Sequence, residues 1–316
     1  MAAALALAGR GRGLTAPNPN VGCVIVKDGR VAGRGWTQPG GRPHAEAMAL
    51  AEAGEQARGA TAYVTLEPCA HRSGRGPACS DALIAAGVAR VVSALRDPDA
   101  RTDGAGHMAL SDAGISVTRD VLVEEARRTA AGFLTRLRLG RPHVTLKLAT
   151  SLDGCIALSD GSSRWITGEV ARAHAHLERA RHEMILIGRG TYDADAPGLD
   201  VRLSGLEGRS PRRAMLTRGG GPEGWETVPS PQAIGALSGI AHLLVEGGAE
   251  TAAAFLAADL VDRLLLYRAP VLIGAGKAAL GDIGLQSLDT AHGRWALADT
   301  RMLGSDRLEA YERVRD

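Results

Sequence analysis

The segment "VGCVIVKDGRVAGRGW" (residues 21–36) decides the fold of the first part of the chain. Its two apolar runs flank Asp28-Gly29, a dipeptide that accepts the positive φ angles of a tight hairpin turn. The segment therefore predicts a β-hairpin. An alanine-rich apolar helix, "HAEAMALAEAG" (residues 44–54), follows it. A hairpin that leads into a helix predicts an α/β domain.

Beyond the hairpin, helical and strand-like segments alternate, which predicts helices that cross over a largely parallel sheet. In the first half we expect helices over about 44–56, 77–87 and 122–140, and strands over 61–67, 89–95 and 113–120. Gly140-Arg141-Pro142 is a natural boundary, so we expect domains over residues 1–141 and 142–316. A second α/β pattern follows, with strands over 143–149, 183–190, 242–248 and 262–274 and helices over 168–182 and 249–260.

Composition favours two globular domains and a small-molecule substrate. The 316 residues suffice for two cores, and 45% hydrophobic with 23% charged residues is typical of globular proteins. A net charge of +2 and an aromatic content of 3% argue against nucleic acid as a partner. The apolar N-terminus, residues 1–14, lacks the basic start of a secretion signal, and we expect a surface helix there. Without a membrane-length apolar run, and with four cysteines that need not pair, we expect a cytoplasmic protein.

One imidazole and two thiols form a candidate zinc site in the first half. Cys69 follows the strand-like segment 61–67 and Pro68, Cys79 lies at the start of the next helix, and His44 begins the helix after the hairpin. One nitrogen and two sulfurs suit a four-coordinate Zn²⁺ whose last position is left for water, as in a catalytic site. Glu46 is not needed as a ligand, so we expect it to move protons to and from the reacting groups.

The pattern His-x-Glu, then Pro-Cys and a second Cys, is typical of zinc deaminases. Nine residues separate Cys69 from Cys79 instead of the usual two, so a loop has to return the second thiol to the metal. Two other readings stay open: a purely structural zinc module, which would have no use for Glu46, and a deaminase that edits nucleic acid. Cys23 and Cys155 lie in apolar, strand-like settings and are expected to be packing residues.

Several motifs of the first half resemble the bifunctional deaminase–reductases of riboflavin biosynthesis. They are "NPNVG" (18–22), "PHAE" (43–46), "YVTLEPC" (63–69), "PCAHRSGRGPAC" (68–79) and "RDPD" (96–99). The resemblance implies a cytidine-deaminase-like three-layer domain that removes the 2-amino group of 2,5-diamino-6-(5-phosphoribosylamino)pyrimidin-4(3H)-one, a pyrimidine ribotide. It also implies that Asn18 binds the pyrimidine edge and that His71 and Arg75 bind the ribose phosphate. Thr37 and Asp99 stand where histidine and asparagine are frequent in the family, and the loop is one residue longer.

The second half resembles the reductase domain of the same family. The matching motifs are "LKLATSLDGCIA" (146–157), "SSRWITGEVAR" (162–172), "GRGTYDADAPGLDVR" (188–202), "LLVEGGAET" (243–251) and "YRAPVLIGAG" (267–276). The resemblance implies a dihydrofolate-reductase-like fold that uses NADPH to reduce the ribosyl group to ribityl. The residues that it places in the substrate pocket are Lys147, Ser163, Arg179, Asp195, Arg202 and Glu246. Those that it places at the cofactor are Thr167, Gly247 and Gly248.

The middle of the second half departs from the family. Residues 203–240 are rich in Gly, Pro, Arg and Ser and form a shorter stretch than usual, with one strand candidate over 212–217. Ala196 replaces an acidic or amide residue. We therefore expect part of the cofactor-binding sheet to be absent or rebuilt. A deaminase whose second domain has lost hydride transfer and serves as a scaffold remains an alternative. We also expect a homo-oligomer, either a dimer or a tetramer.

Overall fold

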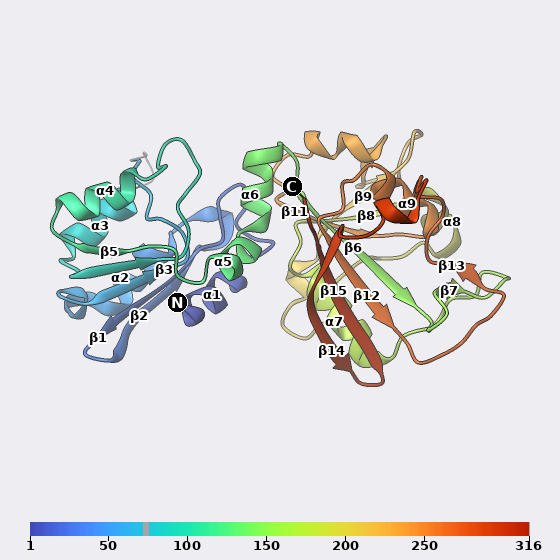
Figure 1. The fold of residues 1–316 in the computed structure, drawn as a ribbon, viewed down its shortest axis with the longest axis horizontal. Helices are drawn as coiled ribbons and strands as arrows, with labels where there is room; N and C mark the ends of the chain where they lie inside the picture. The colour runs from blue at the N-terminus through green and yellow to red at the C-terminus, as the bar shows by residue number, and fades with distance from the viewer. Residues whose placement is uncertain (72–75, 316) are drawn as a thin grey trace. The chain divides into compact units, whose positions relative to one another are not determined.

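The computed structural model describes residues 1–71 and 76–315. The chain forms two compact units, Met1–Gly140 and Arg141–Asp316. Each unit is a β-sheet packed with helices, coloured blue to green for the first and green to red for the second (Figure 1). No helix among these residues is long and apolar enough to cross a membrane.

The first unit contains a five-stranded sheet in the order β2-β1-β3-β4-β5. β1 is antiparallel to β2 and β3, whereas β3, β4 and β5 run parallel to one another. The strands are β1 (Gly22–Lys27), β2 (Arg30–Trp36), β3 (Thr61–Val64), β4 (Arg90–Ser93) and β5 (Ser116–Thr118). The helices are α1 (Ala2–Ala8), α2 (Ala45–Ala53), α3 (Cys79–Ala85), α4 (Ala105–Asp112), α5 (Val123–Thr129) and α6 (Ala131–Leu139).

The hairpin predicted over residues 21–36 is present as β1 and β2. Asp28 and Gly29 connect the two strands with φ angles of 49° and 74°. Both angles are positive, as a two-residue hairpin turn of this kind requires. The Asp-Gly dipeptide therefore forms the turn that the sequence predicts.

Glycines of the hairpin let helices pack directly on both faces of the sheet. A Cβ on Gly22 would lie 1.9 Å from the carbonyl oxygen of Ala4 in α1, and a Cβ on Gly33 would lie 2.1 Å from that of Ala49 in α2. Gly33 is paired across the ladder with Ile25, three residues after Gly22, so the two glycines face opposite sides of the sheet. The unit therefore has three layers, with helices above and below the sheet.

We expect Gly33→Ala to destabilise the first unit by about 1–3 kcal/mol, because the added methyl group must push α2 off the sheet. Urea unfolding of the variant and of the parent protein measures the difference. Gly9→Ala is the matched control, since nothing lies within 4 Å of a Cβ at that position. An unchanged unfolding midpoint for Gly33→Ala would show that the two elements are not in this close contact.

One expectation for the first unit is wrong, and one of its helices was not expected. The single helix predicted over 122–140 is divided at Ala130, whose φ of −89° and ψ of 9° are not helical, into α5 and α6. α4 was not predicted, because "AGHMALSD" is a short segment of mixed polarity. The expected surface helix at the N-terminus is present as α1, and it buries Ala4 and Ala8 against the sheet.

The second unit is built on an eight-stranded sheet in the order β10-β9-β8-β11-β6-β12-β15-β14, with a separate β13-β7 pair. The strands are β6 (His143–Thr150), β7 (Cys155–Ala157), β8 (Met184–Gly188), β9 (Arg212–Leu216), β10 (Glu226–Val228), β11 (His242–Glu246), β12 (Arg263–Arg268), β13 (Lys277–Ala278), β14 (Trp295–Leu303) and β15 (Asp306–Arg313). The helices are α7 (Glu169–Arg179), α8 (Arg189–Asp195) and α9 (Ala249–Ala257).

Helices cover both faces of this sheet. Phe255 of α9 packs on one face with Leu146 and Val245, whereas Ala175 of α7 packs with Tyr267 in a separate cluster. β10, β9, β8, β11, β6 and β12 run parallel. The carboxyl ends of these strands therefore meet at one edge of the sheet, where α/β proteins commonly bind ligands.

The shortened middle stretch, residues 203–240, still contributes strands to one edge of the eight-stranded sheet. β9 occupies the predicted segment 212–217, and β10 pairs with it in parallel, so two strands are present where one was expected. The β14–β15 hairpin was not predicted. Most residues of β14 are exposed, and the strand therefore lacks the apolar–polar alternation that marks a half-buried strand.

Candidate functional site

Three metal-binding side chains meet in the first unit. His44 is the residue before α2, Cys69 follows the end of β3, and Cys79 is the first residue of α3. Their ligand atoms all lie within 4.8 Å of one another. His44 Nδ1 is 3.3 Å from Cys79 Sγ and 3.8 Å from Cys69 Sγ. The long loop thus returns Cys79 to Cys69, as the sequence required.

Electrostatics within this cluster favour a thiolate. A hydrogen bond from Cys79, together with His44, lowers the pKa of Cys69 to about 4 although burial opposes the shift. The hydrogen bond with Cys69 in turn raises the pKa of His44. The backbone N–H of Cys79 also donates to Cys69 Sγ over 3.3 Å. Thiolate sulfur and imidazole nitrogen are the donors that Zn²⁺ prefers, so the set fits that ion.

Glu46 lies beside the cluster in the first turn of α2 and is only 3% exposed. Burial raises the pKa of its carboxyl group, and the nearby His44 opposes that rise. A buried carboxylate that is not needed to hold the metal is suited to carrying a proton. Its position separates this site from a purely structural zinc site, in which a fourth protein ligand closes the coordination.

Three other residues were proposed for the deaminase pocket, and the structure describes two of them, Asn18 and His71. Asn18 is half-buried, and its amide nitrogen donates to the carbonyl of Gly41 over 2.9 Å. His71 is half-buried. A hydrogen bond from the neighbouring Arg101 lowers the pKa of Asp99 to about 2. Arg75 lies outside the described residues.

The departure at Thr37 has a structural explanation. Thr37 is buried, and its hydroxyl oxygen accepts a hydrogen bond from the backbone N–H of Val21 over 3.0 Å. The backbone N–H of Thr37 donates back to the carbonyl of Val21 over 2.9 Å. Thr37 therefore closes the open end of the β1–β2 ladder.

The second unit has a cavity of about 720 Å³ at the carboxyl edge of its sheet. All nine residues that the sequence proposed for the reductase line it: Lys147, Ser163, Thr167, Arg179, Asp195, Arg202, Glu246, Gly247 and Gly248. They come from strands, helices and loops that are far apart in the sequence. Thr167 precedes the first residue of α7 by two positions.

A buried charge cluster lines this cavity. Glu246 and Lys147 are direct neighbours in the β11–β6 ladder, and Lys147 Nζ lies 3.9 Å from a Glu246 oxygen. Arg179 of α7 donates two hydrogen bonds to the Glu246 carboxylate, over 2.8 and 2.9 Å. Although burial alone would raise the pKa of Glu246, the two cations lower it to about 2. Glu246 is therefore ionised at neutral pH.

Arg179→Met is expected to cost about 3 kcal/mol of stability at pH 7, because it leaves Glu246 buried with a single, more distant cation. In the parent protein the depressed pKa of Glu246 stabilises the fold above its ordinary pKa, and this contribution is lost as the pH falls from about 5 towards 2. Urea unfolding of the second unit should be measured at both ends of this pH range. Between them, the free energy of unfolding should fall less in Arg179→Met than in the parent protein.

Arg202→Met is the matched control for that measurement. The Arg202 side chain is 62% exposed and lies 3.6 Å from Asp200, so its removal should cost less than about 1 kcal/mol. Equal losses in the two variants would contradict the buried ion pair.

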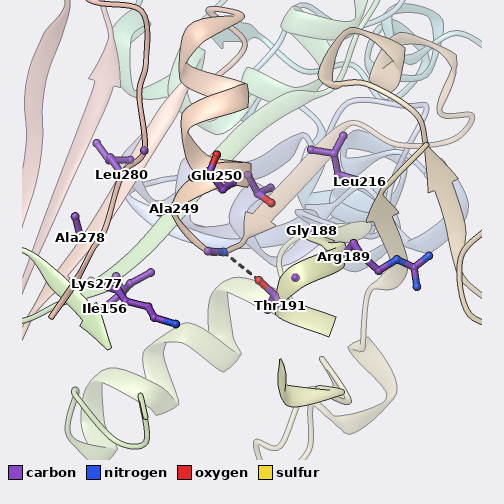
Figure 2. Close-up of a pocket in the computed structure, with 14 residues that line it drawn as sticks. Ile156, Gly188, Arg189, Thr191, Leu216, Ala249, Glu250, Lys277, Ala278 and Leu280 are labelled. Carbon is purple, nitrogen blue, oxygen red and sulfur yellow. Dashed lines mark hydrogen bonds between the residues drawn. The ribbon is translucent and has the colours of Figure 1, made fainter. Parts of the chain in front are cut away.

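A second cavity, of about 670 Å³, adjoins the first (Figure 2). The two share Ile156, Gly190, Thr191 and Gly248 among their lining residues. Gly248 precedes α9, and its backbone N–H donates to the hydroxyl of Thr191 over 3.1 Å, the dashed line in Figure 2. The Gly247-Gly248 pair proposed for the cofactor therefore lies where the two cavities meet.

Sequence reasoning missed several residues of these cavities. Arg172 and His176 were missed, although they share one face of α7 with the predicted Arg179 at four- and three-residue spacing, and all three line the larger cavity. That spacing is a signal that the sequence already contained. Trp165, which is 66% exposed, also lines it, and Arg172 stacks over the indole ring at 4.7 Å from the centroid.

These features define a class of protein. The first unit combines a zinc-type donor set with a buried carboxylate, as hydrolytic zinc deaminases do. Residues 1–95 match the family model of the cytidine and deoxycytidylate deaminase zinc-binding region. Residues 142–223 and 233–308 match the model of the RibD C-terminal domain, and the gap between them falls in the shortened middle stretch.

Curated relatives extend the similarity over the whole chain. The chain is 41% identical to the riboflavin biosynthesis protein RibD of Escherichia coli over 355 aligned positions, which cover 97% of this chain and 96% of that protein. It is also 41% identical to RibD of Mycobacterium tuberculosis, over 94% of this chain and 91% of that one.

Solved structures agree. Acinetobacter baumannii RibD is 37% identical, covers 99% of this chain with 98% of its own, and superposes with a TM-score of 0.87. A deaminase/reductase from Thermotoga maritima is 33% identical, covers 99% of this chain with 97% of its own, and has a TM-score of 0.89.

The chain belongs to the RibD family of riboflavin biosynthesis, with a zinc-binding deaminase domain followed by a reductase domain. The predicted fold class is confirmed: a cytidine-deaminase-like α/β domain precedes a dihydrofolate-reductase-like one. A reductase domain of this family implies a nicotinamide cofactor.

Proposed function

We propose that this chain catalyses two consecutive reactions on one pyrimidine ribotide. In the first, water displaces the 2-amino group of 2,5-diamino-6-(5-phosphoribosylamino)pyrimidin-4(3H)-one as ammonia, giving the uracil. In the second, NADPH reduces the ribosyl side chain of that uracil to ribityl. The name of the Thermotoga maritima protein specifies both a diaminohydroxyphosphoribosylaminopyrimidine deaminase and a 5-amino-6-(5-phosphoribosylamino)uracil reductase, which supports the proposal.

The convergence of His44, Cys69 and Cys79 beside Glu46 is the observation that carries the first reaction. These three residues would hold zinc. When bound, zinc supplies a Lewis acid that makes water nucleophilic at neutral pH. The Glu46 carboxylate would take a proton from the attacking water and give one to the departing ammonia.

Recognition of the ribotide in the first unit would rest on three further residues. Asn18 would bind the pyrimidine edge, and His71 and Arg75 would bind the ribose phosphate. An amide presents both a donor and an acceptor to a base edge, whereas cationic side chains pair with phosphate. The retained motifs support these roles, since "NPNVG" (18–22) and the loop of residues 68–79 match the family.

The charge cluster of the larger cavity supports the second reaction. Glu246, kept ionised by Arg179 and Lys147, would accept hydrogen bonds from the hydroxyl groups of the opened ribose. Ser163, Asp195 and Arg202 would complete the substrate pocket. Bound NADPH supplies the hydride. Thr167, Gly247 and Gly248 would position it, because glycine backbone lets a phosphate approach the start of α9 closely.

The test is NADPH oxidation by the purified full-length chain, supplied with the deaminated ribotide. Absorbance at the reduced nicotinamide band should fall, with one ribityl product formed per NADPH consumed. If ammonia is released from the diaminopyrimidine but the uracil is never reduced, the second domain is a scaffold and only the deaminase half of the proposal stands.

A further inference from the structure

His176 lies between two arginines on the wall of the larger cavity. It belongs to α7 and lines this cavity together with Arg179, three residues later on the same helix, and with Arg202, which follows α8. Both arginines have a role in the proposed reduction, whereas His176 has none so far. The contacts of its imidazole ring indicate what it contributes.

Both ring nitrogens of His176 contact the segment that carries Arg202. Nδ1 lies 3.1 Å from the carbonyl oxygen of Asp200, which only accepts hydrogen bonds, so Nδ1 carries the proton. Nε2 lies 3.3 Å from a guanidinium nitrogen of Arg202, which only donates, so Nε2 accepts. The neutral ring protonated on Nδ1 satisfies both partners. The backbone N–H of Arg202, 3.3 Å from Nδ1, suits the opposite tautomer, but that tautomer would turn two donors towards each other at Nε2.

The surroundings of His176 keep its ring neutral. Burial lowers the pKa of the imidazole, and the positive charges of Arg179 and Arg202 lower it further. The hydrogen bond with Asp200 and the negative charge of Glu246 on β11 oppose the shift but are outweighed. The neutral ring is therefore the form present at pH 7, and its Nε2 lone pair can accept from Arg202.

The Arg202 side chain has few other contacts that would fix it. It is 62% exposed, and the carboxylate of Asp200 lies 3.6 Å away and is 47% exposed, so this ion pair is weak. A mobile arginine loses rotational freedom when it binds a ligand, and this loss reduces affinity. The segment itself is held to α7, because Arg179 also donates to the Asp200 carbonyl, over 3.1 Å. A hydrogen bond from the guanidinium to His176 would extend this order to the side chain.

We propose that His176 is a positioning residue that holds the guanidinium of Arg202 ready for the phosphate of the ribotide; the proposal rests on the proposed reductase function. The phosphate is the anionic group of this substrate, and a guanidinium binds phosphate through charge-assisted hydrogen bonds. Protonation of His176 would place an N–H group and a positive charge against Arg202, so the contact would be lost. Binding of the ribotide therefore depends on the neutral ring.

The test is steady-state NADPH oxidation by the full-length chain with 5-amino-6-(5-phosphoribosylamino)uracil. His176→Leu removes the acceptor, so KM should rise about three- to tenfold, the cost of immobilising one long side chain, while kcat changes by less than about twofold. His176→Gln can present an amide oxygen in place of Nε2, so its KM should stay within about twofold of the parent value. Both variants are assayed well below their thermal midpoints, so that unfolding does not contribute.

His292→Leu is the matched control. His292 is exposed in the loop before β14 and lines neither cavity, so its replacement should leave KM and kcat unchanged.

The pH dependence of KM gives a second readout that a purely structural role would not change. The pKa of His176 is below its ordinary value, so the parent should lose the contact as the pH falls from about 7 to about 5. Over this range the ratio of the parent KM to the KM of His176→Gln should rise, by up to about tenfold. Titration of the substrate phosphate affects both proteins and cancels in the ratio.

Three results would overturn the positioning role: a parental KM in His176→Leu, a raised KM that His176→Gln does not restore, or a ratio that falls at low pH. The last would mean that the imidazolium itself binds the phosphate. If the parent chain does not reduce the ribotide at all, the proposed function fails and the positioning role with it. If it does, and His176→Leu behaves as the parent, only the positioning role is wrong.

Discussion

Glu46→Gln should keep its zinc and lose ammonia release. Glutamine has nearly the shape of glutamate but cannot accept a proton, and a positioned acid–base group contributes about a hundred- to ten-thousandfold to a rate. The three metal ligands are untouched, so the zinc content should stay at one per chain. Both quantities should be measured on the same sample, zinc by atomic absorption and ammonia by a coupled assay with the diaminopyrimidine ribotide.

Glu52→Gln is the matched control for this variant. Glu52 lies on the same helix, α2, and pairs with Arg34 over 3.2 Å at the surface. Its replacement removes the same charge without reaching the cluster, so ammonia release should remain at the parental rate. Deamination by Glu46→Gln at the parental rate would show that another group moves the protons.

Cys79→Ser should lose zinc and stability together. A hydroxyl is a far weaker zinc ligand than a thiolate, and removing a group that merely supports a ligand already costs about ten- to a hundredfold in metal affinity. We therefore expect at least about a hundredfold weaker zinc binding. Because the metal binds the folded state only, the first unit should also unfold at a lower temperature.

Cys155→Ser controls for the loss of a thiol. Cys155 is buried in the second unit, where its sulfur lies 3.7 Å from the carbonyl of Gly274. A serine hydroxyl can replace this contact, so bound zinc and ammonia release should be retained. Full zinc content in Cys79→Ser would mean that the ion is held by a different set of residues.

The alternation of strands and helices was sufficient to predict both α/β units, because most elements bury one face and show it as periodicity. Prediction failed for exposed or short elements of mixed polarity. β14 exposes most of its residues, and α4 is a short helix of mixed polarity. The interruption at Ala130 could not be predicted either, since alanine favours a helical conformation.

The metal cluster was predictable because chemistry restricts zinc ligands to few residue types, and His44, Cys69 and Cys79 occur at element boundaries. The arrangement of Arg179, Lys147 and Glu246 was not, because it depends on the β11–β6 register and on the placement of α7. Only the structure shows that His176 contacts the guanidinium of Arg202, since the two residues lie 26 positions apart in the sequence.

Removal and return of zinc tests the central claim most directly. The full-length chain is treated with a chelator, and bound zinc and ammonia release are followed as the metal is added back. We expect ammonia release to disappear with the metal and to return in proportion to zinc bound, reaching its maximum at one ion per chain. A chain that holds less than about a tenth of its zinc and still deaminates at the full rate would contradict the account.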